Sequence, residues 1–339
     1  MPAAVYKGNR TIVVEEIPVP QLGASQVLLE VSHCGICGTD LHMVMEGWGR
    51  TGSTGGHEYS GVVSKLGSGV TGWAEGDRVV GGPRPGCGRC ANCRAGNGNL
   101  CRNRPRSGME PFVGAFARYK AVEADALFAV PSGLDLRTAA LTEPLAVALR
   151  GVRRTDAQPG DRVLVTGAGP IGLLTVALLS ARGVTDVVVS EPGRKRRERA
   201  LELGAAAVIA PGELERPAMP MEVVTEPYRL AFECSGRVEA MEAALDNLDR
   251  AGTLMLSGAG MERPRFDSNR IILNELVVTG TYEYTREDYE LAMDLLTSKR
   301  LPEGLLIEPG DQPLDRLQWA MEQLVAGELA GKVLVAPGA

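Results

Sequence analysis

The feature that most constrains the fold of this chain is a glycine-rich turn between a strand pattern and a helix pattern. An apolar run typical of a β-strand, residues 163–165, precedes the turn, and an apolar helix pattern follows it. Glycines there let the backbone approach a pyrophosphate, which the amide groups of the helix N-terminus then face. This context makes the motif a dinucleotide-binding signal. The predicted cofactor-binding residues of the turn are Gly167, Gly169, Pro170, Ile171 and Gly172.

A second strand pattern, residues 187–190, ends at Glu191. A carboxylate at this position accepts hydrogen bonds from the ribose hydroxyls of NAD. The basic run 194–197 follows directly, and we expect Arg196 to contact the cofactor. Such a run also suits the 2′-phosphate of NADP, or an ordinary solvated helix start. Glu191 would repel a phosphate, so the sequence favours NAD and leaves NADP open.

Three later strand patterns end in small residues, near positions 236, 258 and 281. Ligands bind beyond the carboxyl ends of parallel strands. We therefore predict Ser257 and Thr281 as cofactor-binding residues, with Ser235, Gly258 and Tyr282 as further candidates to line the nicotinamide pocket. Ordinary turn chemistry explains these residues equally well.

Four of the seven cysteines fall between positions 87 and 101. Four thiolates form a closed tetrahedral zinc site, and neighbouring glycines let the loop curl around it. Cys87, Cys90, Cys93 and Cys101 are the predicted ligands of a structural zinc. The cluster is flanked by Arg84, Arg89, Arg94, Arg102, Arg104 and Arg106, so a nucleic-acid-binding zinc ribbon is an alternative. The net charge of −6 disfavours both nucleic acid and an anionic membrane.

A second group of possible ligands is Cys37, His57 and Glu58. A thiolate, an imidazole and a carboxylate leave one position of a zinc ion open, as catalytic sites require. Zinc bound there would lower the pKa of an alcohol and so prepare hydride transfer to a nucleotide. The catalytic residues we predict are Glu58, with Thr39 and His42 as a path for the released proton. A plain surface loop is the alternative for Thr39 and His42.

Two carboxylates have less certain roles. Asp40 either orients a ligating histidine or caps a turn. Glu143 lies in an otherwise apolar stretch and is either a fourth metal candidate or an acidic residue at a helix start. Whether Glu58 or Glu143 binds zinc directly stays open from spacing alone.

The chain divides into two kinds of pattern. Residues up to about 145 carry short β-type runs and glycine turns, whereas strands and helices alternate from about 147 to 283, which indicates a doubly wound parallel sheet in an α/β protein. The N-terminus lacks the apolar core of a secretory signal, so we expect a cytoplasmic protein with reduced cysteines. Residues 163–181 are apolar enough to suggest a membrane helix, but glycines and a proline interrupt them.

The motifs CGICGTDLH, GHE, CGRCANC, EPLAVAL and GAGPIG, in this order, resemble those of the zinc-dependent medium-chain dehydrogenases over nearly the whole chain. The resemblance implies a GroES-like catalytic domain from residues 1–146 and 284–339, with a structural zinc lobe at about 84–104. It implies a Rossmann domain at 147–283 that binds NAD(P). Simple alcohol dehydrogenases have a cysteine where this chain has Glu143. That departure points to the sorbitol, threonine and glucose dehydrogenase branch, which acts on polyols, sugars or amino alcohols.

The resemblance therefore implies a zinc-dependent oxidoreductase that interconverts a secondary alcohol and a ketone with NAD(P). It also implies a homodimer or homotetramer. A zinc-free quinone or enone reductase on the same fold and a non-catalytic nucleotide-binding protein are the alternatives.

Overall fold

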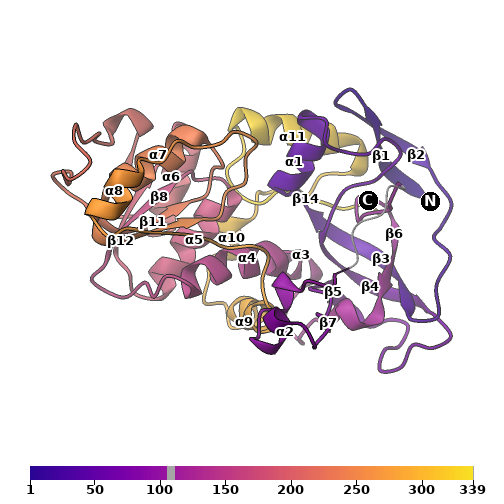
Figure 1. Ribbon diagram of the computed structural model, residues 1–339. Helices are drawn as coiled ribbons and strands as arrows, with labels where there is room; N and C mark the ends of the chain where they lie inside the picture. Colours follow the sequence, from indigo (N-terminus) through magenta and orange to yellow (C-terminus); the bar gives the residue numbers. More distant parts are fainter. Residues whose placement is uncertain (105–110, 339) are drawn as a thin grey trace.

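Two six-stranded sheets and an N-terminal hairpin organise the chain (Figure 1). The computed structural model describes residues 1–104 and 111–338. Arg106, one of the arginines counted around the cysteine cluster, lies outside these residues.

The first sheet is parallel throughout and occupies the left half of Figure 1. Its central strand is a valine- and leucine-rich run buried on both faces, as parallel sheets require. The strand order reverses between the neighbours β8 and β11, which creates the switch point where ligands bind in such sheets. In spatial order the strands are β10 (Ala207–Ile209), β9 (Asp186–Ser190), β8 (Arg162–Thr166), β11 (Tyr228–Glu233), β12 (Leu248–Leu256) and β13 (Val277–Gly280).

The second sheet is antiparallel and lies in the right half of Figure 1. Its strands pack around a hydrophobic core of their own. The strands are β14 (Leu334–Val335), β3 (Gln26–Gly35), β4 (Glu58–Leu66), β5 (Arg78–Gly81) and β7 (Leu127–Ala129), with β6 (Tyr119–Glu123) on β3 and the separate hairpin β1 (Pro2–Gly8) and β2 (Thr11–Glu16).

Helices cover the sheets and connect them. They are α1 (Gly38–Met45), α2 (Ala91–Arg94), α3 (Leu136–Ala139), α4 (Thr142–Arg153), α5 (Pro170–Ala181), α6 (Arg194–Glu202), α7 (Val238–Asp246), α8 (Ser268–Leu273), α9 (Arg286–Thr297), α10 (Glu303–Leu306) and α11 (Leu317–Ala326). The apolar run from 163 to 181 is divided into β8, the glycine turn and α5. Among the described residues, no helix combines the length and apolar character needed to cross a bilayer.

Helix α4 runs across the predicted boundary between residues 146 and 147. It packs against both α5 and α9. Thr285 caps α9 by accepting from the amide of Asp288, and the Asp288 carboxylate accepts in return from the Thr285 amide. The end of the chain returns to the antiparallel sheet, where β14 pairs with β3. One rigid helix and the chain terminus thus join the two halves.

Candidate metal centres and cofactor site

The first candidate metal centre is built where α1 and β4 begin. Ligand atoms of Cys37, His57 and Glu58 all lie within 4.8 Å of one another. The buried Asp40 holds the two segments together, because its carboxylate oxygens accept from the amides of Cys37 and Gly56, each at 3.0 Å. Its Oδ1 also lies 3.9 Å from Nδ1 of His57. Asp40 therefore orients the predicted ligands without belonging to the cluster.

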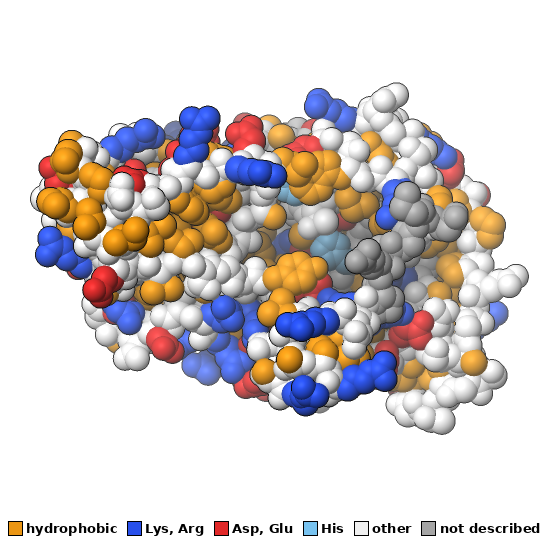
Figure 2. Space-filling model, in the orientation of Figure 1, with side chains coloured by type: hydrophobic (Ala, Val, Ile, Leu, Met, Phe, Trp, Pro, Cys, Tyr) orange, Lys and Arg blue, Asp and Glu red, His pale blue; other side chains and the backbone are white. Residues whose placement is uncertain are grey.

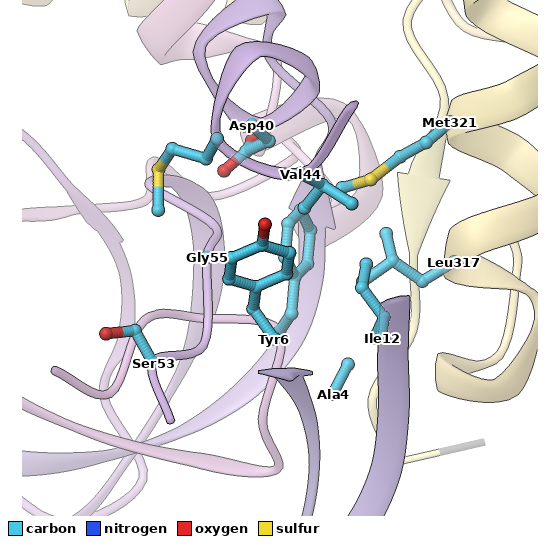
Figure 3. Close-up of a pocket in the computed structure, with 11 residues that line it drawn as sticks. Ala4, Tyr6, Ile12, Asp40, Val44, Ser53, Gly55, Leu317 and Met321 are labelled. Carbon is cyan, nitrogen blue, oxygen red and sulfur yellow. The ribbon is translucent and has the colours of Figure 1, made fainter. Parts of the chain in front are cut away.

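A small, mostly apolar cavity borders Asp40. Figure 3 shows the carboxylate at its edge, with Val44, Leu317 and Met321 among the other side chains that line it. Burial in these surroundings disfavours the charged form and raises the pKa of Asp40, although His57 and the two amides oppose the shift. The carboxylate is thus held in place by hydrogen bonds from two backbone amides.

Glu58 is the ligand candidate whose surroundings best fit a metal. Its Oε1 accepts from the Nζ of Lys332 at 2.7 Å, and both side chains are almost fully buried. Its Oε2 is buried without a hydrogen-bond partner, and a Cβ on Gly35 would lie 2.1 Å from it. A buried carboxylate oxygen needs a partner. With a thiolate and an imidazole nearby, the donor set fits zinc.

Glu143 lies in the first turn of α4, half-buried and near enough to His57 and Glu58 for their charges to act on its pKa. It is not among the three residues whose ligand atoms cluster. Burial raises the pKa of Glu143 to about 7, although the charge of His57 opposes the shift and Tyr284 donates a hydrogen bond to the carboxylate. Both sequence-based interpretations of Glu143 fit this position, since it begins a helix and also faces the candidate metal site.

The predicted proton path lies on α1. The Cys37 thiol is 3.7 Å from the Thr39 hydroxyl, which is exposed. The His42 ring stacks on Trp48 at 4.7 Å, and its Nε2 lies 3.2 Å from the carbonyl of Ala259, beyond β12. His42 therefore reaches across the space between the two halves, where histidine side chains are visible in a hollow (Figure 2).

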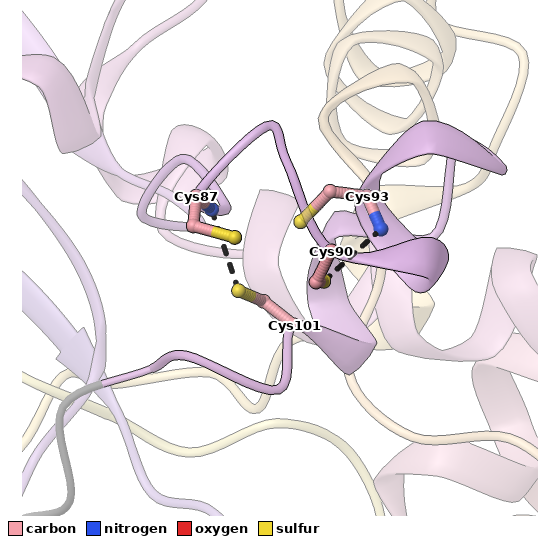
Figure 4. Close-up of side chains that lie close together, drawn as sticks. All are labelled: Cys87, Cys90, Cys93 and Cys101. Atoms are coloured by element: carbon pink, nitrogen blue, oxygen red, sulfur yellow. Dashed lines mark hydrogen bonds between the residues drawn. The ribbon is translucent and has the colours of Figure 1, made fainter.

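The four remaining predicted metal ligands form one compact lobe. Figure 4 shows the sulfur atoms of Cys87, Cys90, Cys93 and Cys101 turned toward one another, and all four lie within 4.8 Å. The backbone amides of Arg89 and Cys90 lower the pKa of the Cys87 thiol to about 6. Desolvation, with the Cys90 thiol adding to it, raises the pKa of Cys93 to about 12. Four thiolates so close together require a cation, and tetrahedral zinc fits them.

The glycine turn is shaped for a dinucleotide. Gly167 has a left-handed φ of 87°, and a Cβ on Gly172 would lie 1.9 Å from the Gly167 carbonyl oxygen. Gly169 caps the twelve-residue helix α5, Pro170 opens it, and open space lies beside Gly169. The backbone is thus accessible exactly where the helix amides face outward, which fits a pyrophosphate.

Glu191 stabilises this turn from the end of β9. Its Oε2 accepts from the amide of Ala168 and its Oε1 from the amide of Gly193, each at 2.8 Å. Arg196 instead donates to the carbonyls of Leu324 and Leu329, at 2.8 and 3.2 Å. Its guanidinium is therefore engaged with the end of α11, and its role as a cofactor residue stays a prediction.

Ser257 and Thr281 come together beside α4. A Cβ on Gly151 would lie 3.3 Å from Oγ of Ser257 and 3.6 Å from the methyl group of Thr281. The Thr281 hydroxyl is buried without a partner. This position beyond the strand ends, with an unused hydroxyl, suits a nicotinamide group.

Three residues near these sites escaped the sequence analysis. Lys332 pairs with Glu58, Tyr284 contacts Glu143, and the buried Glu233 accepts from the amides of Ser235 and Gly236. Glu233 had a usable signal, since it is a carboxylate at the end of an apolar strand. Lys332 and Tyr284 had none, because their partners lie far away in the sequence.

Two protein families match this chain. Residues 23–132 match the alcohol dehydrogenase GroES-like domain, and residues 170–298 match zinc-binding dehydrogenase. The chain is 35% identical over 303 residues to 2-dehydro-3-deoxy-L-galactonate 5-dehydrogenase of Pseudoalteromonas atlantica, covering 88% of each chain. It is 34% identical to sorbitol dehydrogenase of Halalkalibacterium halodurans, covering 97% of each.

A solved structure is similar over the same length. It is a putative zinc-binding dehydrogenase from Sinorhizobium meliloti bound to NADP, with a TM-score of 0.84, 32% identity and 99% of each chain covered. The matched families agree with the two sheets and with the two candidate metal centres described above. The chain therefore belongs to the zinc-dependent medium-chain dehydrogenases, as an oxidoreductase with a GroES-like part and a Rossmann-type parallel sheet.

Proposed function

We propose that this enzyme interconverts a secondary hydroxyl of a polyol or sugar derivative and the corresponding ketone, with NAD as the hydride carrier. The observation that carries the proposal is the cluster of Cys37, His57 and Glu58, in which Glu58 keeps one buried oxygen without a partner. The cluster lies near α4, which leads from Glu143 to the strand ends where Ser257 and Thr281 meet.

Each residue has a distinct proposed role. Cys37, His57 and Glu58 would hold a zinc ion, which supplies a Lewis acid that favours loss of the proton from a substrate hydroxyl. Thr39 accepts that proton and His42 passes it toward solvent. Glu143 contributes a carboxylate beside the metal, either as a ligand or through water. Asp40 and Lys332 keep the ligands in place.

The substrate class follows from the relatives together with Glu143. Two relatives are named for a sugar-acid derivative and for sorbitol. A polyol-type substrate presents several hydroxyls, and polar groups around the metal can accept hydrogen bonds from those that do not react. This chemistry favours a polyhydroxylated substrate over a simple alcohol.

Three sets of contacts support NAD over NADP. Glu191 is a buried carboxylate directly after β9, where an acidic residue can accept hydrogen bonds from the adenosine ribose. Arg196 is engaged with α11, and Lys195 pairs with Glu328 at 2.6 Å. Arg197 donates to the carbonyls of Glu191 and Pro192. A 2′-phosphate would therefore lie beside a carboxylate, whereas Arg196 and Arg197 already donate hydrogen bonds to backbone carbonyls.

We also propose the domain division 1–146 with 284–339, and 147–283, because every strand of the parallel sheet lies within the second range.

A homodimer through β13 fits the same half. Among the described residues β13 pairs only with β12, and Ile272, Leu273 and Val277 are exposed nearby. Hydrophobic side chains gather over this part of the molecule in Figure 2. Light scattering of the wild type and of Val277→Arg tests the dimer, and a monomeric wild type would contradict it.

The reaction is tested by following nicotinamide absorbance with zinc-loaded protein, NAD or NADP, and polyols, sugar acids, amino alcohols and simple secondary alcohols. We expect NAD reduction by polyols or sugar derivatives, lost in Glu58→Gln. Glu30→Gln is the matched control, because Glu30 pairs with Arg118 on the surface. Turnover of quinones by zinc-free protein would replace the proposal with a reductase, and preference for NADP would overturn the assignment of NAD.

A further inference from the structure

A four-residue segment, Thr281 to Tyr284, touches both the cofactor side and the metal side of the proposed active site. We call residues 281–284 the strap. Its first residue donates its amide to the carbonyl of Leu256 at 3.0 Å and keeps a buried hydroxyl without a partner. Its last residue, the buried Tyr284, lies close enough to Glu143 for each side chain to act on the pKa of the other. Any displacement of the strap therefore moves a nicotinamide-facing hydroxyl and the support of the catalytic carboxylate together.

The middle of the strap is held by the cysteine lobe. Asn99, which lies two residues before Cys101 and is 5% exposed, donates Nδ2 to the carbonyl of Tyr282 at 2.8 Å. Arg104, three residues after Cys101, forms an ion pair with Glu283. Both contacts join side chains of the lobe to a segment almost two hundred residues away in the sequence.

The backbone of the strap does not favour its own conformation. Glu283 has a φ of 50°, in the left-handed region that non-glycine residues adopt at a cost. Such a conformation persists only where the surroundings enforce it. The two lobe contacts lie at Glu283 itself and at the residue before it, so they are placed to enforce this turn.

A second connection runs from the lobe to the helix that carries Glu143. Asn97 accepts from Nη2 of Arg150 on α4 at 2.9 Å, and Arg150 also pairs with Asp288 of α9. The lobe thus contacts α4 directly as well as through the strap. The four-cysteine site is therefore connected to the helix that carries Glu143, and its role is not limited to stabilising a distant loop.

We propose that Asn99 and Arg104 are positioning residues, through which the folded cysteine lobe fixes the strap and, with it, Thr281 and the Tyr284–Glu143 contact. The inference rests on the proposed function in assigning Thr281 to the nicotinamide and Glu143 to the catalytic centre. The lobe has a matched control at its base, because Arg84 pairs with Glu123 of β6 at 3.1 Å and does not touch the strap.

The test compares Asn99→Ala, Arg104→Met and Arg104→Lys with Arg84→Met in the full-length, zinc-loaded protein. Loss of a supporting contact around a metal or catalytic group typically costs about 10–100-fold. We expect Asn99→Ala and Arg104→Met to lower kcat by at least about 10-fold, with Arg104→Lys partly restored and Arg84→Met unchanged. Zinc content is expected to stay at the wild-type value in all four variants, which separates positioning from loss of the lobe.

Hydrogen exchange of the peptide that contains residues 281–284 gives a readout independent of turnover. We expect exchange there to be roughly 10-fold faster in Asn99→Ala and Arg104→Met, without such a change in Arg84→Met. Equal exchange in all variants, or equal loss of kcat in Arg84→Met, would overturn the inference. If the wild type oxidised no alcohol with either nucleotide, the proposed function would fail, and the exchange measurement would still decide whether the lobe positions the strap.

Discussion

The two candidate metal centres of this chain are built in opposite ways. The cysteine lobe takes its four ligands from fifteen consecutive residues, 87–101, and orients them with local amides such as that of Cys93 on the Cys90 sulfur. The catalytic candidate takes Cys37 from the start of α1, His57 and Glu58 from the start of β4, and a supporting lysine from position 332. One centre is a local loop, and the other exists only when distant segments have packed together.

This difference separates what each centre contributes. A local four-thiolate site binds metal almost independently of the rest of the fold, so its loss affects stability first. A centre assembled from distant segments depends on the fold and contains charges that burial would otherwise destabilise. Loss of a ligand is therefore expected to change activity more than stability, whereas loss of a buried charge partner is expected to change stability. Four experiments order these effects by size.

The largest expected effect is on activity. Cys37→Ser removes the one thiolate of this donor set, and losing several kcal/mol of metal-based stabilisation corresponds to a fall of roughly 10³-fold in kcat/KM. The unfolding midpoint should hardly change, because Cys37 lies beside an open site and is partly exposed. Steady-state kinetics and urea unfolding measure both. Cys93→Ser is the comparison, and a loss of stability larger in Cys37→Ser than in Cys93→Ser would contradict the division.

The buried ion pair gives the next effect. Lys332→Met leaves the Glu58 carboxylate buried without its partner, which is expected to destabilise the protein by about 3–5 kcal/mol. Lys7→Met removes an ion pair of similar length, 2.6 Å to Glu15, from the surface, and should cost about 0–1 kcal/mol. Urea unfolding of both variants provides the measurement. Similar losses would mean that the Lys332–Glu58 pair is solvated.

Space around Glu58 gives a smaller effect. A methyl group at Gly35 would collide with Glu58 Oε2, so Gly35→Ala is expected to cost about 1–3 kcal/mol and to weaken zinc binding at the catalytic centre. Gly38→Ala is the control, because nothing lies within 4 Å of its Cβ position. Thermal unfolding and zinc titration against a chelating dye test both. Equal zinc affinity in the two variants would mean that Glu58 is not a ligand.

The smallest effect concerns the support of α4 and depends on pH. Burial opposes ionisation of Asp288, but hydrogen bonds from Thr285 and the charges of Arg150 and Arg153 lower its pKa. A lowered pKa stabilises the fold above the unfolded value of about 3.9, and this stability is lost as the pH falls through the lower folded value. Asp288→Asn should therefore cost about 1.5 kcal/mol at neutral pH and little in acid.

Unfolding free energies between pH 7 and pH 3 test this prediction. The expected result is a wild-type curve that falls more steeply with acid than the curve of the variant. Parallel curves would show that protonation of Asp288 does not contribute to the loss of stability in acid.

The sequence predicted the sites that are built from neighbouring residues, but not the contacts between residues that lie far apart in the sequence. Gly167, Gly169 and the four lobe cysteines lie within motifs whose physics is complete in a few residues, and the structure describes the turn and the lobe there. Lys332 and Asn99 carry no such signal. Their partners, Glu58 and the Tyr282 carbonyl, are 274 and 183 residues away in the sequence. Arg196 shows that a motif does not settle the partner of a basic side chain. This residue follows the predicted cofactor motif, but its guanidinium donates to the end of a distant helix.

The contact between Lys332 and Glu58 also sets an order of events during synthesis. Chains fold from the N-terminus as they emerge, so the cysteine lobe can close on its metal while most of the protein is still unmade. Glu58 must wait for Lys332, which is added 274 residues later. A product truncated before Lys332 would thus carry a finished lobe and an unfinished catalytic centre.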